Sequence, residues 1–202
     1  MGEAAAKSAI MTALDGRAFR DALGWFATGV TIITTRSAAD ELVGFTANSF
    51  SSVSLDPPLV LFSLNRQAQC LRVFESSAHF AVNVLSAEQT ELSSRFATAV
   101  HDRWHGVAFT TGEGGCPILE GAVAVFECAV HGMHEGGDHR IFLGQVLRMR
   151  AEAEGRPLLF CRGAYRELGP PLGQPAESAA PSSTSALDNG GLLAGLEPWV
   201  SA

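Results

Sequence analysis

Apolar residues in this chain fall mostly in short runs, and turn-forming residues separate the runs. Short runs rich in β-branched and aromatic residues are typical of β-strands. A glycine-rich segment at residues 135–138 separates two long runs and predicts a hairpin turn. We expect strands at residues 30–35, 43–54, 59–64, 79–85, 107–111, 122–133, 139–149 and 157–162.

A few segments have the apolar spacing of short helices instead. Phe19, Leu23 and Phe26 recur at helical spacing, and Asp15 precedes them as a candidate N-cap. The predicted helices cover residues 17–26, 70–74 and 87–96. Because strands dominate and do not alternate with helices as in βα units, the pattern predicts a barrel or sandwich of mostly antiparallel strands.

The composition indicates one folded domain with a tail. The chain has 202 residues, of which 47% are hydrophobic and 17% charged, so it can bury a sizeable core. From Pro170 onward Pro, Ser, Ala, Gly and Gln dominate, as they do in flexible tails. We therefore expect an N-terminal extension over residues 1–16, a folded domain over 17–169 and a flexible tail over 170–202.

Charge and motif content exclude several classes of protein. The net charge of −7, without a run of Lys or Arg, argues against a nucleic-acid or anionic-membrane partner. The sequence has no signal peptide, no apolar run of membrane length and no CxxC pair among its four cysteines, so we expect a reduced, cytoplasmic protein. It also lacks a P-loop, a G-x-S-x-G motif and a G-x-G-x-x-G motif, which makes a Rossmann domain unlikely.

The densest group of polar side chains lies between two apolar runs, from residue 44 to residue 64. Hydroxyl and amide side chains crowd into this segment at Thr46, Asn48, Ser49, Ser51, Ser52 and Ser54. Such groups bind a phosphorylated ligand without net positive charge, although an exposed polar strand face would have the same composition. Ser63, Asn65 and Arg66 follow at the end of a buried strand and favour the binding interpretation.

A second candidate is the histidine in Gly137-Asp138-His139, directly after the predicted turn. Its imidazole would project from a rim and orient a nicotinamide, or it would simply be a solvated turn residue. Cys128, His131, His134 and His139 only loosely resemble a zinc pattern. Strand alternation places Cys128 and His131 on opposite faces, so we predict no metal site.

Together these segments resemble the flavin reductase-like family, which has an FMN-binding split-barrel fold. The matching motifs extend over residues 17–168. They are residues 26–35 (Phe-Ala-Thr-Gly-Val-Thr-Ile-Ile-Thr-Thr), 44–58 (Gly-Phe-Thr-Ala-Asn-Ser-Phe-Ser-Ser-Val-Ser-Leu-Asp-Pro-Pro), 80–85 (Phe-Ala-Val-Asn-Val-Leu), 137–139 (Gly-Asp-His), 157–160 (Pro-Leu-Leu-Phe) and 163–165 (Gly-Ala-Tyr). The chain departs from the family pattern at Trp104-His105-Gly106 and at Arg140.

The resemblance implies a mainly β, Greek-key split barrel with peripheral helices. It further implies a homodimeric NAD(P)H:flavin oxidoreductase that binds FAD or FMN, uses NADH or NADPH, and supplies reduced flavin to an oxygenase component that oxidises aromatic compounds. Carried over to this sequence, the flavin site would comprise Thr46, Ala47, Asn48, Ser49, Ser52, Val53, Ser54, Ser63, Asn65, Phe96 and Ala97. His139, the candidate catalytic residue, and Tyr165 would lie near the nicotinamide.

Two rival functions stay open at this point. A non-enzymatic flavin carrier would use the same barrel, because fold does not fix function. An oxidase of a pyridoxine-like substrate would need more cationic phosphate ligands than residues 63–66 supply. The sequence does not decide between FAD and FMN or between NADH and NADPH, although Arg140 and Arg162 are candidate partners for a 2′-phosphate.

Overall fold

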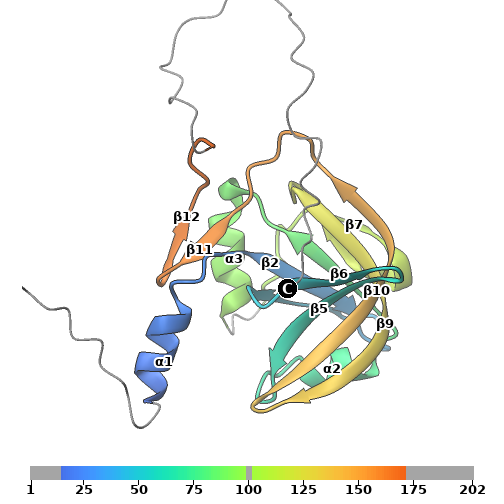
Figure 1. Ribbon diagram of the computed structural model, residues 1–202. Coiled ribbons are helices and arrows are strands. Elements are labelled where there is room, and N and C mark those ends of the chain that lie inside the picture. Colours follow the sequence, from blue (N-terminus) through green and yellow to red (C-terminus); the bar gives the residue numbers. More distant parts are fainter. Residues whose placement is uncertain (1–14, 99–101, 172–202) are drawn as a thin grey trace, which may run out of the picture. The chain divides into compact units, whose positions relative to one another are not determined.

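The computed structural model describes residues 15–98 and 102–171 (Figure 1). The chain divides into two compact units, residues 1–168 and 169–202, and the account below concerns the first. Its centre is a seven-stranded sheet in which every neighbouring pair is antiparallel. The strand order is β3 (Leu42–Ala47), β2 (Thr31–Arg36), β6 (His79–Val84), β9 (Ala124–Gly136), β10 (His139–Ala151), β5 (Pro58–Asn65) and β4 (Ser51–Leu55). The predicted mostly β, antiparallel fold is confirmed.

Short elements complete the unit. The helices are α1 (Gly16–Leu23), α2 (Leu71–Ser76) and α3 (Thr90–Ala97), with 3₁₀ turns at Ala87–Gln89 and Glu113–Gly115. A three-stranded sheet joins β1 (Thr28–Gly29), β11 (Leu159–Cys161) and β12 (Ala164–Arg166), and a two-stranded sheet joins β7 (Phe109–Thr111) and β8 (Pro117–Leu119). None of the described helices is long and apolar enough to cross a membrane. The expected cytoplasmic location stays a prediction.

Two of the differences from the sequence-based expectation change the course of the chain, and the other boundaries shift by a few residues. The strand expected over residues 43–54 is two strands, β3 and β4, because the chain leaves the ladder at residues 48–50. The helix expected to reach Phe26 ends at Leu23, and the Gly24 carbonyl instead accepts a hydrogen bond from the Arg162 backbone nitrogen (2.8 Å). In both places contacts with distant residues override the local pattern.

Phenylalanine rings fill the concave side of the large sheet. The Phe62 and Phe142 rings stack with centroids 4.9 Å apart, and Phe80 meets Phe62 edge-on at 5.0 Å. All three residues are at most 1% exposed. Phe45 of the edge strand β3 packs against Phe62 and against Phe74 of α2. The sheet therefore curls around one aromatic core, and its edge strands β3 and β4 both lie next to the segment at residues 48–50.

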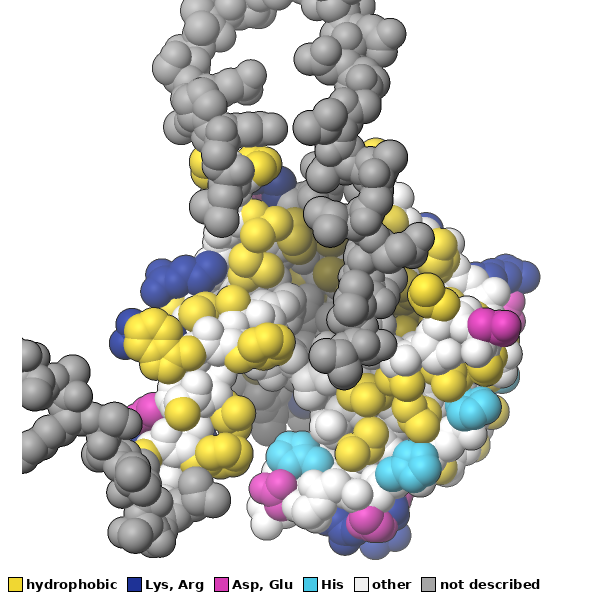
Figure 2. Space-filling view, viewed as in Figure 1, with side chains coloured by type: hydrophobic (Ala, Val, Ile, Leu, Met, Phe, Trp, Pro, Cys, Tyr) yellow, Lys and Arg dark blue, Asp and Glu magenta, His cyan; other side chains and the backbone are white. Residues whose placement is uncertain are grey.

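The apolar residues of α1 lie outside this core. No residue of α1 is buried: Phe19 and Leu23 are 51% and 57% exposed, and Trp25 and Phe26, which follow the helix, are 67% and 78% exposed. Figure 2 shows hydrophobic side chains gathered over this helix, which projects away from the seven-stranded sheet in Figure 1. The apolar side chains of an amphipathic helix normally pack against another surface, but here they are exposed to water.

Candidate functional site

A pocket of about 470 Å³ lies between the β3–β4 connection and the β9–β10 hairpin. Its lining residues are Phe45, Thr46, Ala47, Asn48, Ser49, Ser63, Leu64, Asn65, Gly136, His139 and Ile141. Strand pairing brings the distant segments together, because His139 of β10 lies opposite Asn65 of β5 and Ile141 lies opposite Ser63. Among the described lining residues there is no Lys, Arg, Asp or Glu.

The Ser49 side chain fixes one wall of this pocket. Its hydroxyl donates to the Ser63 carbonyl and accepts from the Ser63 backbone nitrogen, both at 3.0 Å. On the other side, the Thr31 hydroxyl donates to the Ala47 carbonyl at 2.8 Å. The segment at residues 46–49, called the Thr46 segment below, is therefore attached to β2 and to β5. Its conformation is set before any ligand arrives.

A smaller pocket of about 180 Å³ shares Thr46 and Asn48 with the first. Its other lining residues are Val30, Ser93, Ala97, Phe160 and Tyr165. The buried Ser93 organises this side: the Tyr165 hydroxyl donates to the Ser93 hydroxyl at 2.8 Å, and the Thr46 hydroxyl donates to the Ser93 carbonyl at 2.6 Å. The Thr46 segment thus lines both cavities, with His139 in the lining of one and Tyr165 in the lining of the other.

The histidine at the rim is held by its neighbour in the chain. His139 Nδ1 lies 2.7 Å from Asp138 Oδ1, and the His139 side chain is 40% exposed. This hydrogen bond, with the charge of the imidazole, lowers the pKa of the Asp138 carboxyl below its usual value. Asp138 therefore orients the imidazole, which leaves Nε2 as the ring nitrogen free for a ligand.

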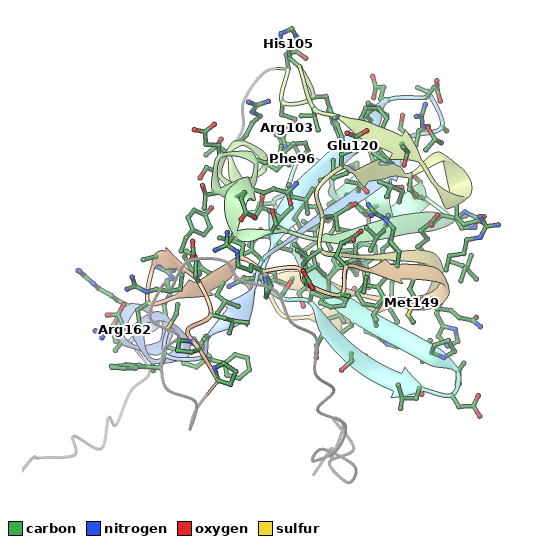
Figure 3. All side chains as sticks on the ribbon, turned by 90° about the horizontal axis from the view of Figure 1, so that it is seen from above. Phe96, Arg103, His105, Glu120, Met149 and Arg162 are labelled. Carbon is green, nitrogen blue, oxygen red and sulfur yellow. The ribbon has the colours of Figure 1, made fainter. Side chains whose placement is uncertain are left out.

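The structure gathers most of the residues predicted for the site. Those that line the larger pocket are Thr46, Ala47, Asn48, Ser49, Ser63, Asn65 and His139, and those that line the smaller one include Ala97 and Tyr165. Ser52, Val53 and Ser54 lie on the edge strand β4, outside the described lining of both pockets. Phe96, which is labelled in Figure 3, is 1% exposed. Its ring packs edge-on against Trp104, with ring centroids 4.9 Å apart. Its part in the structure is in the core.

Sequence reasoning did not select Ser93, Gly136 or Ile141 as site residues. Gly136 and Ile141 flank the turn that carries His139, so hairpin pairing of that segment would have found them. Ser93 carried no signal, because it is one polar residue of a helix and its importance comes from hydrogen bonds to Thr46 and Tyr165.

The cysteines are absent from the described linings of these two pockets. Cys128 is fully buried in the aromatic core, whereas His131 is exposed and lies at a register shift of the β9–β10 pair. Burial raises the pKa of the Cys128 thiol to about 12 and that of Cys116 to about 11. Both thiols stay protonated at neutral pH and are poor nucleophiles there.

The larger pocket fits a flavin in size and in chemistry. Its volume falls in the range of about 300–1,000 Å³ that is usual for cofactor sites. The Asn48 amide is exposed, and the Asn65 amide uses its oxygen for the Gln67 backbone nitrogen at 2.8 Å, which leaves an NH₂ group to donate. Neutral donors and acceptors of this kind suit the polar edge of an aromatic ring system.

Comparison with known proteins gives the family. The profile of the flavin reductase like domain matches residues 23–169. The chain is 46% identical over 167 residues to a probable flavin reductase of Rhizobium meliloti, covering 82% of this chain and 52% of that protein, so it spans about half of that relative's length. It is 41% identical over 165 residues to the reductase subunit of a flavin-dependent monooxygenase of Mycobacterium tuberculosis, covering 81% and 88% of the two chains.

Solved structures agree with this assignment. An NADH:FAD oxidoreductase of Streptomyces globisporus, solved in complex with NAD and FAD fragments, superposes with a TM-score of 0.74 at 40% identity, over 78% of this chain and 95% of that one. A homologue of nitrilotriacetate monooxygenase component B from Mycobacterium thermoresistibile gives 0.75 at 41% identity, over 82% and 93%. The chain belongs to the flavin reductase-like family, and the expected family is confirmed.

Proposed function

We propose that this protein is a flavin reductase, which uses a nicotinamide nucleotide to reduce FAD or FMN for a partner oxygenase. The observation that carries the proposal is the convergence of the Thr46 segment, Asn65 and His139 on one uncharged pocket. Family membership and the names of the relatives support the same activity.

In this proposal the protein binds and orients, because the cofactors carry the chemistry. When bound, nicotinamide donates a hydride, with its two electrons, to the flavin ring. Backbone N–H groups of the Thr46 segment and the Asn48 and Asn65 amides hold the polar edge of the flavin and favour the charge that develops there. The fixed position of this segment, attached through Thr31 and Ser49, reduces the cost of ordering the site.

His139 and Tyr165 have different parts in the proposal. His139, oriented by Asp138, contacts the nicotinamide at the open side of the larger pocket. Tyr165 positions Ser93 and forms one side of the smaller pocket. The family resemblance also implied flavin contacts for Ser52, Val53, Ser54 and Phe96, and these contacts stay predictions.

The direct test is NADH or NADPH oxidation, followed by absorbance, with and without added FAD or FMN. A reductase oxidises the nicotinamide only when flavin is present. Tight flavin binding without oxidation of either nucleotide would instead indicate a flavin carrier and would contradict the proposal.

We further infer a homodimer in which α1 and the residues that follow it, 24–26, are part of the interface. The exposed apolar residues Leu23, Trp25 and Phe26 support this, because single chains rarely leave such a surface in water. Light scattering coupled to size exclusion would give twice the chain mass, and Leu23→Asp with Phe26→Asp would lower it. Arg17→Glu on the same helix is the control, and an unchanged mass in the Asp variant would contradict the inference.

The partner oxygenase also belongs to the proposal. Relatives named as reductase subunits of monooxygenases support it. An oxygenase reconstituted with this protein, flavin and NADH should turn over its aromatic substrate, whereas omission of this protein should abolish turnover. Turnover at an equal rate without it would contradict the assigned partner.

A further inference from the structure

Two partly exposed hydroxyl groups of the smaller pocket, one from β3 and one from β12, donate to the same buried residue. The Tyr165 hydroxyl donates to the Ser93 side-chain oxygen at 2.8 Å, and the Thr46 hydroxyl donates to the Ser93 carbonyl at 2.6 Å. Ser93 lies within α3 and is 0% exposed, and Figure 1 shows α3 beside β11 and β12. Ser93 therefore accepts the protons of both hydroxyls that a ligand in this pocket can reach.

These two hydrogen bonds fix how the hydroxyls can interact with a ligand. A hydroxyl has one proton to donate and two lone pairs with which it accepts. The Ser94 hydroxyl also lies 3.4 Å from the Tyr165 oxygen, but it donates to the Thr90 carbonyl at 3.0 Å. The shorter bond to Ser93 therefore holds the Tyr165 proton. Towards a ligand, Thr46 and Tyr165 both present hydrogen-bond acceptors.

The rest of the smaller pocket does not compete with these acceptors. Its described lining has no Lys, Arg, Asp or Glu, and Val30, Ala97 and Phe160 make it apolar. The exposed Asn48 amide carries both a donor and an acceptor, so it adapts to either kind of ligand group. At about 180 Å³ the pocket is smaller than a usual cofactor site and holds one part of a cofactor.

The direction of these bonds decides which chemical group fits. A ring N–H group in this pocket meets two fixed oxygen acceptors. A carbonyl or a methyl group in the same place meets oxygen lone pairs and gains no hydrogen bond from either hydroxyl. A polar group that enters an apolar pocket without a partner loses the hydrogen bonds that it made to water.

We propose that Ser93 is a positioning residue that makes the smaller pocket selective for an N–H group of a bound cofactor ring. Oxidised flavin carries one such group, at N3, and the carboxamide of nicotinamide carries another. The proposal rests on the proposed function, because it assumes that these rings bind at the Thr46 segment. It goes further by giving Ser93, which a ligand does not reach, a part in recognition.

The binding test has one arm for each source of the N–H group. The first compares the Kd of FMN with that of 3-methyl-FMN, by flavin fluorescence. The second compares NAD⁺ with 3-acetylpyridine adenine dinucleotide, whose methyl ketone has nearly the shape of the carboxamide without its N–H, by calorimetry on the flavin-loaded protein. In at least one arm the wild type should bind the analogue about fivefold more weakly, the effect of one hydrogen bond. That arm identifies the group that enters the pocket.

Ser93→Ala tests the positioning role. It removes the acceptor of the Tyr165 proton, so the Tyr165 hydroxyl can turn and donate to the ligand. The ratio of the two Kd values should therefore fall towards one. Ser94→Ala is the matched control, because this neighbour in α3 is exposed and donates to the Thr90 carbonyl, and the ratio should stay at the wild-type value.

A spectroscopic measurement without ligand reports the same hydrogen bond. Tyr165 is the only tyrosine of the chain, so the tyrosine doublet of the Raman spectrum, which responds to hydrogen bonding of the phenol, belongs to this residue alone. Ser93→Ala should change the doublet and Ser94→Ala should not. Tyr165→Phe is a second variant for the binding test. It keeps the ring that packs against Phe160 at 5.7 Å, and it should lower the ratio as Ser93→Ala does.

The outcomes separate the two proposals. Absence of flavin-dependent oxidation of NADH and NADPH would overturn the proposed function. Flavin-dependent oxidation with equal Kd values for parent compound and analogue in both arms would overturn the selectivity of the smaller pocket. A ratio that Ser93→Ala and Tyr165→Phe both leave unchanged, or an unchanged Raman doublet in Ser93→Ala, would overturn the role of Ser93 while the reductase activity stands.

Discussion

The Ser49 hydroxyl lies 3.0 Å from both the backbone nitrogen and the carbonyl oxygen of Ser63, and so joins the β3–β4 connection to β5. The two residues are 14 positions apart. β3 and β5 are not paired as strands. The Ser49 side chain therefore makes hydrogen bonds to β5 that a paired backbone would otherwise make, at the point where the pocket opens.

Ser49→Ala should therefore destabilise the protein and weaken flavin binding together. The substitution leaves two partly buried backbone groups of Ser63 unpaired, which costs about 1–3 kcal/mol. Urea denaturation would measure the loss of stability, and flavin fluorescence would measure binding. Ser51→Ala is the control, because the exposed Ser51 hydroxyl bonds only to the neighbouring Ser52 carbonyl. If the two variants had equal free energies of unfolding, the hydrogen bonds between Ser49 and Ser63 would contribute nothing to stability.

His139→Ala should impair use of the nicotinamide more than binding of flavin. The imidazole stands at the rim with Nε2 free, whereas the neutral groups of the Thr46 segment remain in place. We expect a higher KM for NADH and a nearly unchanged Kd for flavin. His105→Ala, at a side chain that is 87% exposed and outside both pockets, should change neither constant. A wild-type KM for NADH in the His139 variant would contradict the assigned role.

Gly144→Ala should destabilise the aromatic core. A Cβ at this position would lie 2.2 Å from the Phe80 ring and 3.0 Å from the Cys128 side chain, so the core must shift. Overpacking of this kind costs about 1–3 kcal/mol. At Gly132, in the paired strand, an added Cβ meets its nearest neighbour at 3.7 Å, which is an ordinary contact. Thermal denaturation should place the Gly144 variant well below the Gly132 variant, and the reverse order would refute this description of the core.

The buried thiol of Cys116 predicts a loss of stability at high pH. Burial raises its pKa from 9.0 to about 11, so between these values the unfolded chain releases a proton that the folded chain keeps. The contribution of this thiol is complete below pH 9 and declines as the pH rises towards 11. The free energy of unfolding should fall over this interval, and the fall should be shallower in Cys116→Ala. Parallel pH curves for the two proteins would exclude this thiol as the cause.

Some of the site follows from sequence because its residues are close together in the chain. The Thr46 segment and the Gly137-Asp138-His139 turn each stand out locally, through side-chain chemistry and turn-forming residues. The pairing of His139 with Asn65 depends on strand register between segments far apart, which apolar spacing alone does not give.

The strand boundaries that the sequence did not predict also depend on contacts between segments far apart in the chain. Residues 48–50 have the composition of a continuing strand, but they leave the ladder, and Ser49 bonds instead to Ser63 of β5. β1, β8 and β12 have two or three residues each, too few for any periodicity to appear. The ion pairs of Arg140 likewise depend on α2 and the hairpin, so the sequence left Arg140 as a candidate phosphate ligand.

The most direct test of the account is to titrate the purified protein with FAD and with FMN while recording flavin fluorescence, and then to add NADH to the same sample without oxygen. We predict saturable quenching by at least one flavin, followed by bleaching of the bound flavin. Absence of quenching with both flavins, or quenching without bleaching, would contradict the claim that the uncharged pocket beside His139 brings flavin and nicotinamide together.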